Sequence, residues 1–441
     1  MIPLKRKLGD NNIELIYIGI LLISLFLLVG MNYNSFFILI IISMFLEHEF
    51  FWIKEGSLIP FNLRPSYIIT FVALLYLVPN LLRKIKNDFT FTTHHKLLLL
   101  YYIYCFLVLI SKPTFPSVEH FGQISIGIFL YFTFIILVKN SDFKFIFNVF
   151  LISGIIQLII GIFQLIAGIS TIENVYNLSS FVQHLDLVPY GRPFGTFVEP
   201  DFYGAICTFF VFIFLGEYFK KFSKVTYFVA LFFLLLLFYG AVRASIIGFV
   251  ISLIFLLFNL KDRLRTTTIE RILLFYSFII SIPIFYTTFI RFSYFIRPDF
   301  WSEGFMNPRL LQMGVSFSQF LESPIFGNGL NAYRFLGTQY SNAVEDWMPD
   351  WVISGYDPSL LTSLLNDTGI IGFSLFMTFL YYFFRTILKN NFESNIFVFC
   401  AILSLMISYL FTNGLPFVFT WIFIAMVELY SKIETKTNYE I

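Results

Sequence analysis

Long runs of apolar residues recur along almost the whole chain, separated by shorter polar segments. A run of about 20 apolar residues forms an α-helix long enough to cross a hydrocarbon core roughly 30 Å thick. The short alternating segments of a membrane β-barrel are absent from the sequence. We therefore predict an all-α polytopic membrane protein with about 12 transmembrane helices. The predicted spans are Ile13–Gly30, Ser66–Leu82, Leu97–Ile110, Phe121–Val138, Phe145–Gly168, Phe202–Phe219, Val225–Tyr239, Ala244–Phe258, Ile272–Ile290, Leu360–Phe384, Asn395–Phe411 and Phe417–Tyr430.

A further apolar run, Ser35–Leu46, leaves the number of crossings open between twelve and thirteen. Loop charge distinguishes the two topologies, because cytoplasmic loops carry an excess of Lys and Arg. Twelve spans place the cluster Lys5–Lys7, most other basic residues and both termini on the cytoplasmic side. We therefore interpret Ser35–Phe51 as a re-entrant or interfacial segment on the outer side. A thirteenth span with an outer N-terminus is the alternative.

Composition excludes an ordinary soluble domain. Hydrophobic residues make up 58% of the chain and charged residues only 13%, whereas soluble proteins carry roughly 25% charged residues. The three cysteines, Cys105, Cys207 and Cys400, all lie in apolar runs, which indicates neither a disulfide framework nor a metal cluster. The net charge is only +2, and we expect no nucleic-acid partner.

The predicted topology divides the chain into three parts. Residues 1–144 form N-terminal transmembrane helices, residues 145–384 form a core, and residues 385–441 form C-terminal helices with a cytoplasmic tail. The core includes two outer loops, residues 170–201 and 291–359. Apolar and aromatic residues are interleaved through the second loop, unlike a disordered segment, and connections this long are usually functional when ordered.

We predict that this second loop folds as a small helical lid. It contains an amphipathic segment that follows Pro308 and Arg309, and proline is favoured at the first position of a helix.

The segment Tyr190–Gly204, with the sequence YGRPFGTFVEPDFYG, is the most polar interruption between two long apolar runs. It contains Arg192, Glu199 and Asp201. Ionisable side chains at the mouth of a transmembrane bundle are costly to desolvate, which makes them functional candidates. The alternative is a solvated loop followed by a helix that begins at Phe202 and is capped by Asp201.

Arginine predominates among the basic residues assigned to the outer side, whereas the cytoplasmic side is rich in lysine. A guanidinium group binds phosphate through two hydrogen bonds, while lysine acts as a point charge. The pattern favours an outward-facing anion site that includes Arg243, Arg309 and Arg192. Arg243 is the strongest candidate, because almost no loop separates the apolar runs on its two sides. Alternatively, the outer arginines pair with carboxylates of the same loops.

The five histidines are scattered, and none pairs with another ligand at the spacing of a sequence-local metal site. We predict that His94 and His95 are solvated in a cytoplasmic loop, and that His184 is a weak candidate base. Because no Asp-x-Asp metal motif and no Walker loop is present, we expect no metal ion and no cofactor.

Three polar parts of the core follow one another in order. They are GRPFGTFVEPDFYGA (Gly191–Ala205), YGAVRASIIGFV (Tyr239–Val250), and NPRLLQMGVSFSQFLESPIFGNGLNAY (Asn307–Tyr333) joined to DPSLLTSLLNDTGIIGF (Asp357–Phe373). Together they resemble the O-antigen polymerase and O-antigen ligase superfamily of bacterial inner-membrane proteins. The first part is similar to that family's Arg–Gly–Thr–Phe stretch ahead of a Pro–Asn helix start, and the second to its Ser–Arg–Gly segment. The resemblance covers roughly Phe145–Phe384.

Two departures from the family pattern affect the expected activity. Asp201 stands where asparagine usually follows the proline of the first motif. Ligases typically carry a histidine about eleven residues before the glycine equivalent to Gly369, and here that position is Pro358, preceded by Asp357. Since the usual ligase base is missing, the resemblance favours a polymerase.

The resemblance implies a metal-independent transfer of a glycan from undecaprenyl pyrophosphate to an acceptor sugar hydroxyl, at the outer face of the bacterial inner membrane. The product would be an O-antigen, capsule or exopolysaccharide, and a chain-length regulator and a flippase are implied partners. The expected pyrophosphate-binding residues are Arg243, Arg309 and Arg192, and the unranked candidates for the base are Asp357, Glu199 and Asp201. A ligase acting on lipid A-core or protein is the alternative. A transporter is less favoured, because the predicted spans are almost free of charged residues.

Overall fold

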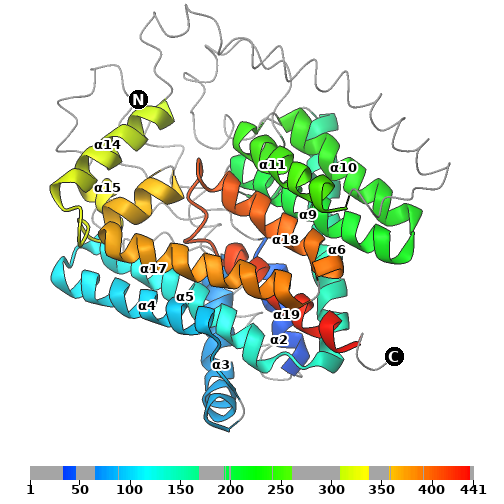
Figure 1. The fold of residues 1–441 in the computed structure, drawn as a ribbon, viewed down its shortest axis with the longest axis horizontal. Helices are drawn as coiled ribbons and strands as arrows, with labels where there is room; N and C mark the ends of the chain where they lie inside the picture. The colour runs from blue at the N-terminus through cyan, green and yellow to red at the C-terminus, as the bar shows by residue number, and fades with distance from the viewer. Residues whose placement is uncertain are drawn as a thin grey trace, which may run out of the picture.

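The structure is a computed structural model that describes residues 33–45, 65–87, 89–167, 193, 195–197, 200–240, 242–260, 308–336, 357, 359–390 and 392–437. Within these ranges the regular elements are all helical, and α14 and α15 lie at one end of the long helix α17 (Figure 1). The helices are α2 (Tyr33–Ser43), α3 (Pro65–Asn87), α4 (Thr93–Ser111), α5 (Phe115–Leu137), α6 (Asn140–Ala167), α9 (Pro200–Lys221), α10 (Lys224–Gly240), α11 (Arg243–Leu260), α14 (Pro308–Glu322), α15 (Ala332–Leu336), α17 (Leu360–Asn390), α18 (Phe392–Ser408) and α19 (Val418–Thr437).

Six helices of the described part are long and apolar enough to cross a membrane. They are Ser66–Lys86, Thr93–Ser111, Phe115–Leu137, Asn140–Ile166, Pro200–Lys221 and Leu360–Lys389. The helices α2, α10, α11 and α18 are apolar but shorter. The prediction of an all-helical fold is thus confirmed for the described residues, and the long apolar helices support the prediction of a membrane protein. Two predicted spans, Ile13–Gly30 and Ile272–Ile290, lie outside the described residues, and each of the others coincides with a helix.

The outer surface of the bundle is apolar, as lipid requires. Along α6, apolar side chains at intervals of three and four residues are exposed, which places them on one helical face. They are Ile152, Ile156, Ile159, Phe163 and Ile166. A stripe of this kind would be a liability in water, because large exposed apolar patches drive association. In a bilayer the same stripe faces hydrocarbon chains, so α6 is suited to the outside of the bundle.

The centre of the bundle is packed mainly with aromatic rings from α6, α9 and α19. Phe209 of α9 stacks on Phe423 of α19 with ring centroids 4.3 Å apart, and Phe150 of α6 meets the edge of Phe423 at 5.4 Å. All three side chains are fully buried. Because lipid is as apolar as these rings, close packing rather than exclusion from water holds such helices together.

Small residues allow the helices to approach where large rings are buried. Gly127 of α5 faces the indole of Trp421 on α19, and a Cβ atom at this position would overlap the ring. Trp421 itself is fully buried, and its Nε1 donates a hydrogen bond to the carbonyl of Leu415 at 2.9 Å. The indole therefore has a fixed position, and α5 can only contact it through a residue without a side chain.

The described part of the long second loop is helical where the sequence predicts it. The amphipathic segment after Pro308 forms α14, which begins at Pro308 as expected for proline at the first helical position. The short α15 follows it, and both pack against α17 (Figure 1). The first outer loop lies almost entirely outside the described residues. The described part of the run Ser35–Leu46 includes α2, which has 11 residues.

We expect the substitution Gly127→Val to lower the free energy of unfolding by roughly 1–3 kcal/mol, because its side chain would displace Trp421. The matched control is Gly122→Val on the same helix, since nothing lies within 4 Å of a Cβ atom there. Thermal unfolding of the detergent-purified proteins, followed by tryptophan fluorescence, measures the difference. Equal melting temperatures for the two variants would contradict the described packing of α5 on α19.

Candidate functional site

The N-terminal part of α17 and the elements around it bury a dense group of polar side chains. Such groups are costly to bury unless they are hydrogen-bonded or bind something. They come from α5, α14, the segments before α15 and α17, α17 itself and the segment after α18, and we call them the polar site. Its buried members are Ser117, Glu119, His120, Gln123, Gln312, Ser316, Gln319, Asn331, Asp357, Ser359, Thr362, Ser363, Asn366, Asp367, Thr368 and Asn413.

The polar site is built around a break in α17 at Gly369. This glycine has φ 62° and ψ −170°, a conformation that is essentially restricted to glycine. The break leaves the last carbonyl groups of the first half of α17 without helical partners. The N–H of Asn328 donates to the carbonyl of Asn366 at 2.7 Å, and the N–H of Gly329 donates to that of Asp367 at 3.2 Å. The freed carbonyls are therefore satisfied by another segment of the chain.

The second half of α17 begins with N–H groups that also lack helical partners. The N–H of Ile370 donates to the carbonyl of Pro324 at 2.9 Å, and the N–H of Ile371 donates to that of Ile325 at 3.4 Å. The single segment Ser323–Asn331 thus caps both sides of the break. A non-helical backbone is tolerated at membrane depth only where protein or water satisfies it, so this segment and the broken helix form one structural unit.

Asp357, a candidate base from the sequence, lies in the polar site and is held by three donors. Its Oδ1 accepts from the N–H of Ser359 at 3.0 Å and from the hydroxyl of Thr362 at 2.6 Å. Its Oδ2 accepts from the hydroxyl of Ser316 on α14. Burial raises the pKa of Asp357 to about 6, and the three hydrogen bonds offset only part of that effect. The carboxyl group is therefore oriented rigidly and changes charge near neutral pH.

Asp367 lies deeper in the same site, beside a histidine that the sequence analysis did not select. Its Oδ1 accepts from the N–H of Ala332 at 3.0 Å, and its Oδ2 accepts from the hydroxyl of Ser363 at 3.3 Å. Ser363 in turn accepts from Nδ2 of Asn413 at 3.0 Å. Nε2 of His120 is 3.8 Å from Oδ2 of Asp367, close enough for a charge interaction but longer than a hydrogen bond.

Two cations border the polar site. Nη1 of Arg334 on α15 forms an ion pair with Oε2 of Glu119 on α5 at 3.1 Å. Nζ of Lys112, just after α4, donates to the carbonyl of Gly327 at 2.9 Å. These contacts tie the segment before α15 to the neighbouring helices α4 and α5, and so fix the position of the polar site relative to the bundle.

Several buried polar atoms of the site have no hydrogen-bond partner among the residues that the structure describes. They are Nδ1 of His120, Oε1 of Gln123, Nε2 of Gln319 and Nδ2 of Asn331. A buried donor or acceptor without a partner costs roughly 1–3 kcal/mol. All four belong to residues of one connected group, which indicates a place where water or a polar ligand is accommodated.

Three of the candidate residues chosen from the sequence lie at the starts of helices. These helix starts lie near the end of α18. Asp201 is the second residue of α9, and Arg243 is the first residue of α11 and is half-buried. These two starts adjoin, because Gly204 of α9 packs directly against Val242. Asp357 lies at the start of α17, where the N–H of Leu360 donates to the carbonyl of Tyr409 just after α18 at 2.9 Å.

Of the remaining candidate residues chosen from the sequence, only one lies in the described part of the chain. Arg309 is the second residue of α14, the helix whose Ser316 contacts Asp357. Arg192 and Glu199 lie outside the described residues, as does His184. The polar site thus contains one predicted base, Asp357, and Arg309 belongs to the helix that supplies Ser316.

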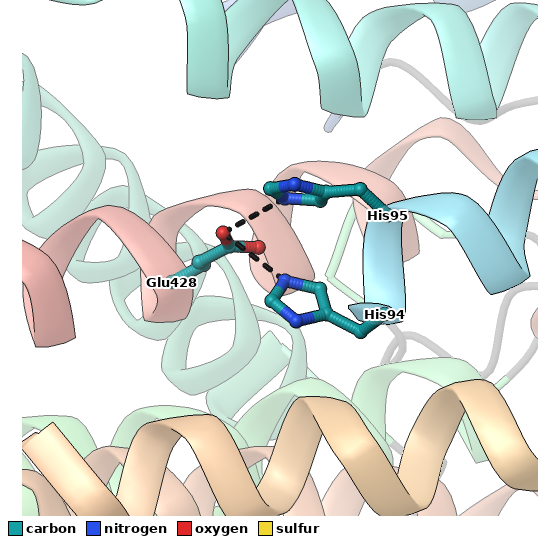
Figure 2. Close-up of side chains that lie close together, drawn as sticks. All are labelled: His94, His95 and Glu428. Atoms are coloured by element: carbon teal, nitrogen blue, oxygen red, sulfur yellow. Dashed lines mark hydrogen bonds and ion pairs between the residues drawn. The ribbon is translucent and has the colours of Figure 1, made fainter. Parts of the chain in front are cut away.

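The prediction that His94 and His95 are solvated is wrong. Both are buried at the start of α4 and converge on Glu428 of α19 (Figure 2). The statement that no histidine has another ligand at sequence-local spacing does not cover this contact, which joins two distant parts of the chain. Local spacing could not reveal this arrangement, because His95 and Glu428 are 333 residues apart in the sequence.

Charged residues inside the predicted spans are also more important than the sequence suggested. Glu217, Asp367 and Glu428 all lie within predicted spans and are buried, each beside a cationic or histidine side chain. Glu119, His120 and Gln123, whose cluster was visible in the sequence near the start of a span, could have been selected as candidates. The small number of charged residues in the predicted spans therefore did not indicate which of them are buried beside a partner.

We expect Gly369→Ala to lower the free energy of unfolding by roughly 2–5 kcal/mol, because alanine disfavours this backbone conformation and its Cβ would overlap the carbonyl of Ile325. Gly314→Ala in α14 is the control, since its Cβ would meet nothing within 4 Å. Thermal unfolding measures stability, and hydrogen exchange of residues 323–331 should rise only in the first variant. Equal stability would contradict the capped break.

The raised pKa of Asp357 predicts a pH dependence of stability. The fold favours the protonated carboxyl group, so stability should fall as the pH rises between about 4 and about 6. Asp357→Asn keeps the shape without the charge, and should be more stable than the wild type by up to roughly 3 kcal/mol at pH 7.5 and nearly equal to it at pH 4. Melting temperatures at both pH values test this, with Glu322→Gln as an exposed control. A difference independent of pH would contradict it.

Comparison with known proteins adds no relative from which a role could be transferred. No family model matches the chain, and no curated protein matches it. The functional argument therefore depends on the residues of the polar site and on their neighbours.

Proposed function

We propose that this protein is a membrane glycosyltransferase that polymerises oligosaccharide repeat units carried on undecaprenyl pyrophosphate. The reaction would take place at the outer face of a bacterial inner membrane and would yield an O-antigen, capsule or exopolysaccharide. The proposal combines the resemblance of the three core segments with the chemistry of the polar site. It includes the topology of about 12 spans, cytoplasmic termini and a helical lid over the outer end.

The main support for the proposal is the raised pKa and the fixed orientation of the Asp357 carboxyl group. A general base works best when its pKa lies near the operating pH, and burial raises the pKa of this carboxyl group to about 6. Three hydrogen bonds from Ser359, Thr362 and Ser316 fix its orientation. Asp357 can therefore accept the proton of an acceptor sugar hydroxyl at neutral pH while holding a constant position.

The leaving group would be stabilised by positive charge at neighbouring helix starts. Arg243 is the first residue of α11, where the helix dipole also favours an anion. The hydroxyl of Ser245, two residues further on, is buried and has no hydrogen-bond partner within the described part of the chain, so it is a candidate donor to a phosphoryl oxygen. Arg309, near the start of α14, and Arg192 would complete the pyrophosphate site.

The proposed reaction is a direct displacement. The oxygen of the acceptor hydroxyl forms a bond to the anomeric carbon of the donor, and the bond from that carbon to the pyrophosphate oxygen breaks. The proton of the acceptor moves to Asp357, and undecaprenyl pyrophosphate leaves with the bonding electron pair. Arginine side chains stabilise the negative charge that develops on the leaving group, which is the kind of contribution that lowers a transition-state barrier most.

Transport of a lipid-linked sugar is the second candidate function. Discontinuous helices with ionisable residues near the break are typical of transporter binding sites, and α17 is broken beside Asp367. The alternative of a ligase keeps the chemistry and changes the acceptor to lipid A-core or protein.

We expect Asp357→Asn to reduce polymerisation by roughly 10²–10⁴-fold, because a general base contributes about that much. Arg243→Ala and Arg309→Ala should each reduce it by roughly 10²–10³-fold. The assay incubates the purified protein with a defined undecaprenyl-pyrophosphate-linked repeat unit and separates the lipid-linked products by length. Because the base must be deprotonated, the wild-type rate should fall as the pH drops below about 6.

Arg385→Ala is the matched control, an exposed arginine near the opposite end of α17. Longer lipid-linked products from the wild type support a polymerase. Product formed only when lipid A-core or a protein acceptor is added means a ligase instead. Movement of the unreacted lipid-linked sugar between leaflets of proteoliposomes, with no new glycosidic bond, would overturn the proposal in favour of transport.

A further inference from the structure

A second buried polar cluster lies apart from the polar site, where the start of α4 meets the C-terminal part of α19 (Figure 2). Nε2 of His94 is 3.3 Å from Oε1 of Glu428, and Nε2 of His95 is 3.0 Å from the same oxygen. The three ligand atoms lie within 4.8 Å of one another, and all three side chains are buried. Neighbouring ligands in a tetrahedral zinc site, with bonds of about 2.0–2.1 Å, are separated by roughly 3.3–3.4 Å. The two distances between a histidine nitrogen and the carboxylate oxygen are close to that value.

The groups around these three residues match those that orient metal ligands. Histidine ligands usually donate their second ring N–H to an oxygen acceptor. Oγ1 of Thr92 is 3.1 Å from Nδ1 of His94, so this oxygen can accept from that ring. The backbone N–H of Thr92 donates to Nδ1 of His95 at 3.2 Å, and Oγ1 lies 2.9 Å from the same nitrogen, so Thr92 fixes the orientation of both rings. The hydroxyl of Tyr131 donates to the other carboxylate oxygen of Glu428.

Apolar residues complete the surroundings of the cluster. The rings of Phe89, Phe91 and Phe132 lie 5.4–6.3 Å from the ring of His95, and Phe383 lies 5.9 Å from that of His94. A shell of this kind limits the access of solvent to a metal site and strengthens its electrostatic interactions.

One further group occupies the cluster: Nζ of Lys432 is 2.6 Å from Oε1 of Glu428. Lysine is a flexible point charge, and its side chain here is 34% exposed. Lys432 can therefore swing outward, which would open a route from solvent to the three ligand atoms. An ammonium group at this position does what a metal cation would do, since it neutralises the buried carboxylate.

The ion pair of Glu217 and Lys221 shows which partners accompany a buried carboxylate that has no histidine beside it. Glu217 of α9 is buried, forms an ion pair with Lys221 at 2.6 Å and accepts from the hydroxyl of Tyr430 at 3.5 Å. Glu428 likewise pairs with the lysine four residues later and accepts from a tyrosine. The lysine and tyrosine therefore suffice to bury a glutamate, and the two histidines at Glu428 are additional.

We propose that His94, His95 and Glu428 form a site for a divalent transition metal, with Zn²⁺ as the preferred ion. Imidazole and carboxylate are the ligands that zinc accepts, and two histidines with one glutamate leave a fourth position for water. Zinc displaces Lys432 from the carboxylate, while Thr92 holds both imidazole rings in place. The metal joins α4 to α19, which also contacts α5 through Tyr131. The site is independent of the proposed transferase activity.

The test uses the full-length protein in detergent, stripped of metal with a chelator. Zn²⁺ is titrated against a competing chromophoric chelator, and Co²⁺ serves as a spectroscopic probe because tetrahedral Co²⁺ absorbs strongly in visible light. We expect one equivalent of either metal to bind. His95→Ala should weaken the affinity by at least roughly 100-fold, and Thr92→Val by roughly 10–100-fold, as for groups that orient metal ligands.

Lys432→Met is the decisive variant, because it leaves all three ligands in place. Loss of the competing cation should tighten Zn²⁺ binding by roughly tenfold or more. Lys221→Met, at the matched Glu217 pair, should leave the Zn²⁺ affinity unchanged. Absence of stoichiometric binding in both the wild type and Lys432→Met would overturn the proposal and leave the cluster as a buried ion pair with two hydrogen-bonded histidines. Binding that is unchanged in His95→Ala would overturn it as well.

Discussion

The break in α17 sets the strictest physical constraint on this structure. A helix that stops and restarts within an apolar bundle exposes backbone N–H and carbonyl groups that no water satisfies, and each unsatisfied group costs several kcal/mol there. The segment Ser323–Asn331 meets this demand on both sides of Gly369. That segment is in turn held by Lys112 through the carbonyl of Gly327. These backbone hydrogen bonds fix the segment Ser323–Asn331 against the two halves of α17.

The bundle contains two buried ionisable clusters that differ in how completely they are satisfied. At Glu428 the carboxylate accepts from or pairs with two histidines, a lysine and a tyrosine, so its charge is well compensated. Around Asp357 and Asp367, by contrast, several buried polar atoms lack partners in the described part of the chain. Incomplete satisfaction costs stability, and proteins retain it mainly where a ligand or a reaction uses it. This incomplete satisfaction is why we assign chemistry to the polar site, whereas the metal site at Glu428 is proposed from the spacing of its three ligand atoms.

The sequence predicted the elements of the fold better than the contacts between them. Apolar runs located the helices, and Pro308 marked the start of α14, because both signals are local. Asp357 was selected from its place in a motif, but its burial depends on Ser316 and Thr362, which only folding brings to it. His120 was missed because its partner Asp367 is far away in the sequence. The charge of Glu428 inside a predicted span was a usable signal, since a buried carboxylate requires partners.

The geometry of the break also bears on whether the protein moves a substrate or transforms it. Alternating access would require the two halves of α17 to change their relation to the segment Ser323–Asn331. Four backbone hydrogen bonds would then break in an apolar environment, and the carbonyl of Ile325, which lies directly against Gly369, would have to shift. A transferase needs the opposite property, because a base and a leaving-group site must stay aligned while the bond forms. A break that is capped on both sides is a suitable support for a fixed carboxylate such as Asp357 and a poor hinge, and this favours catalysis over transport.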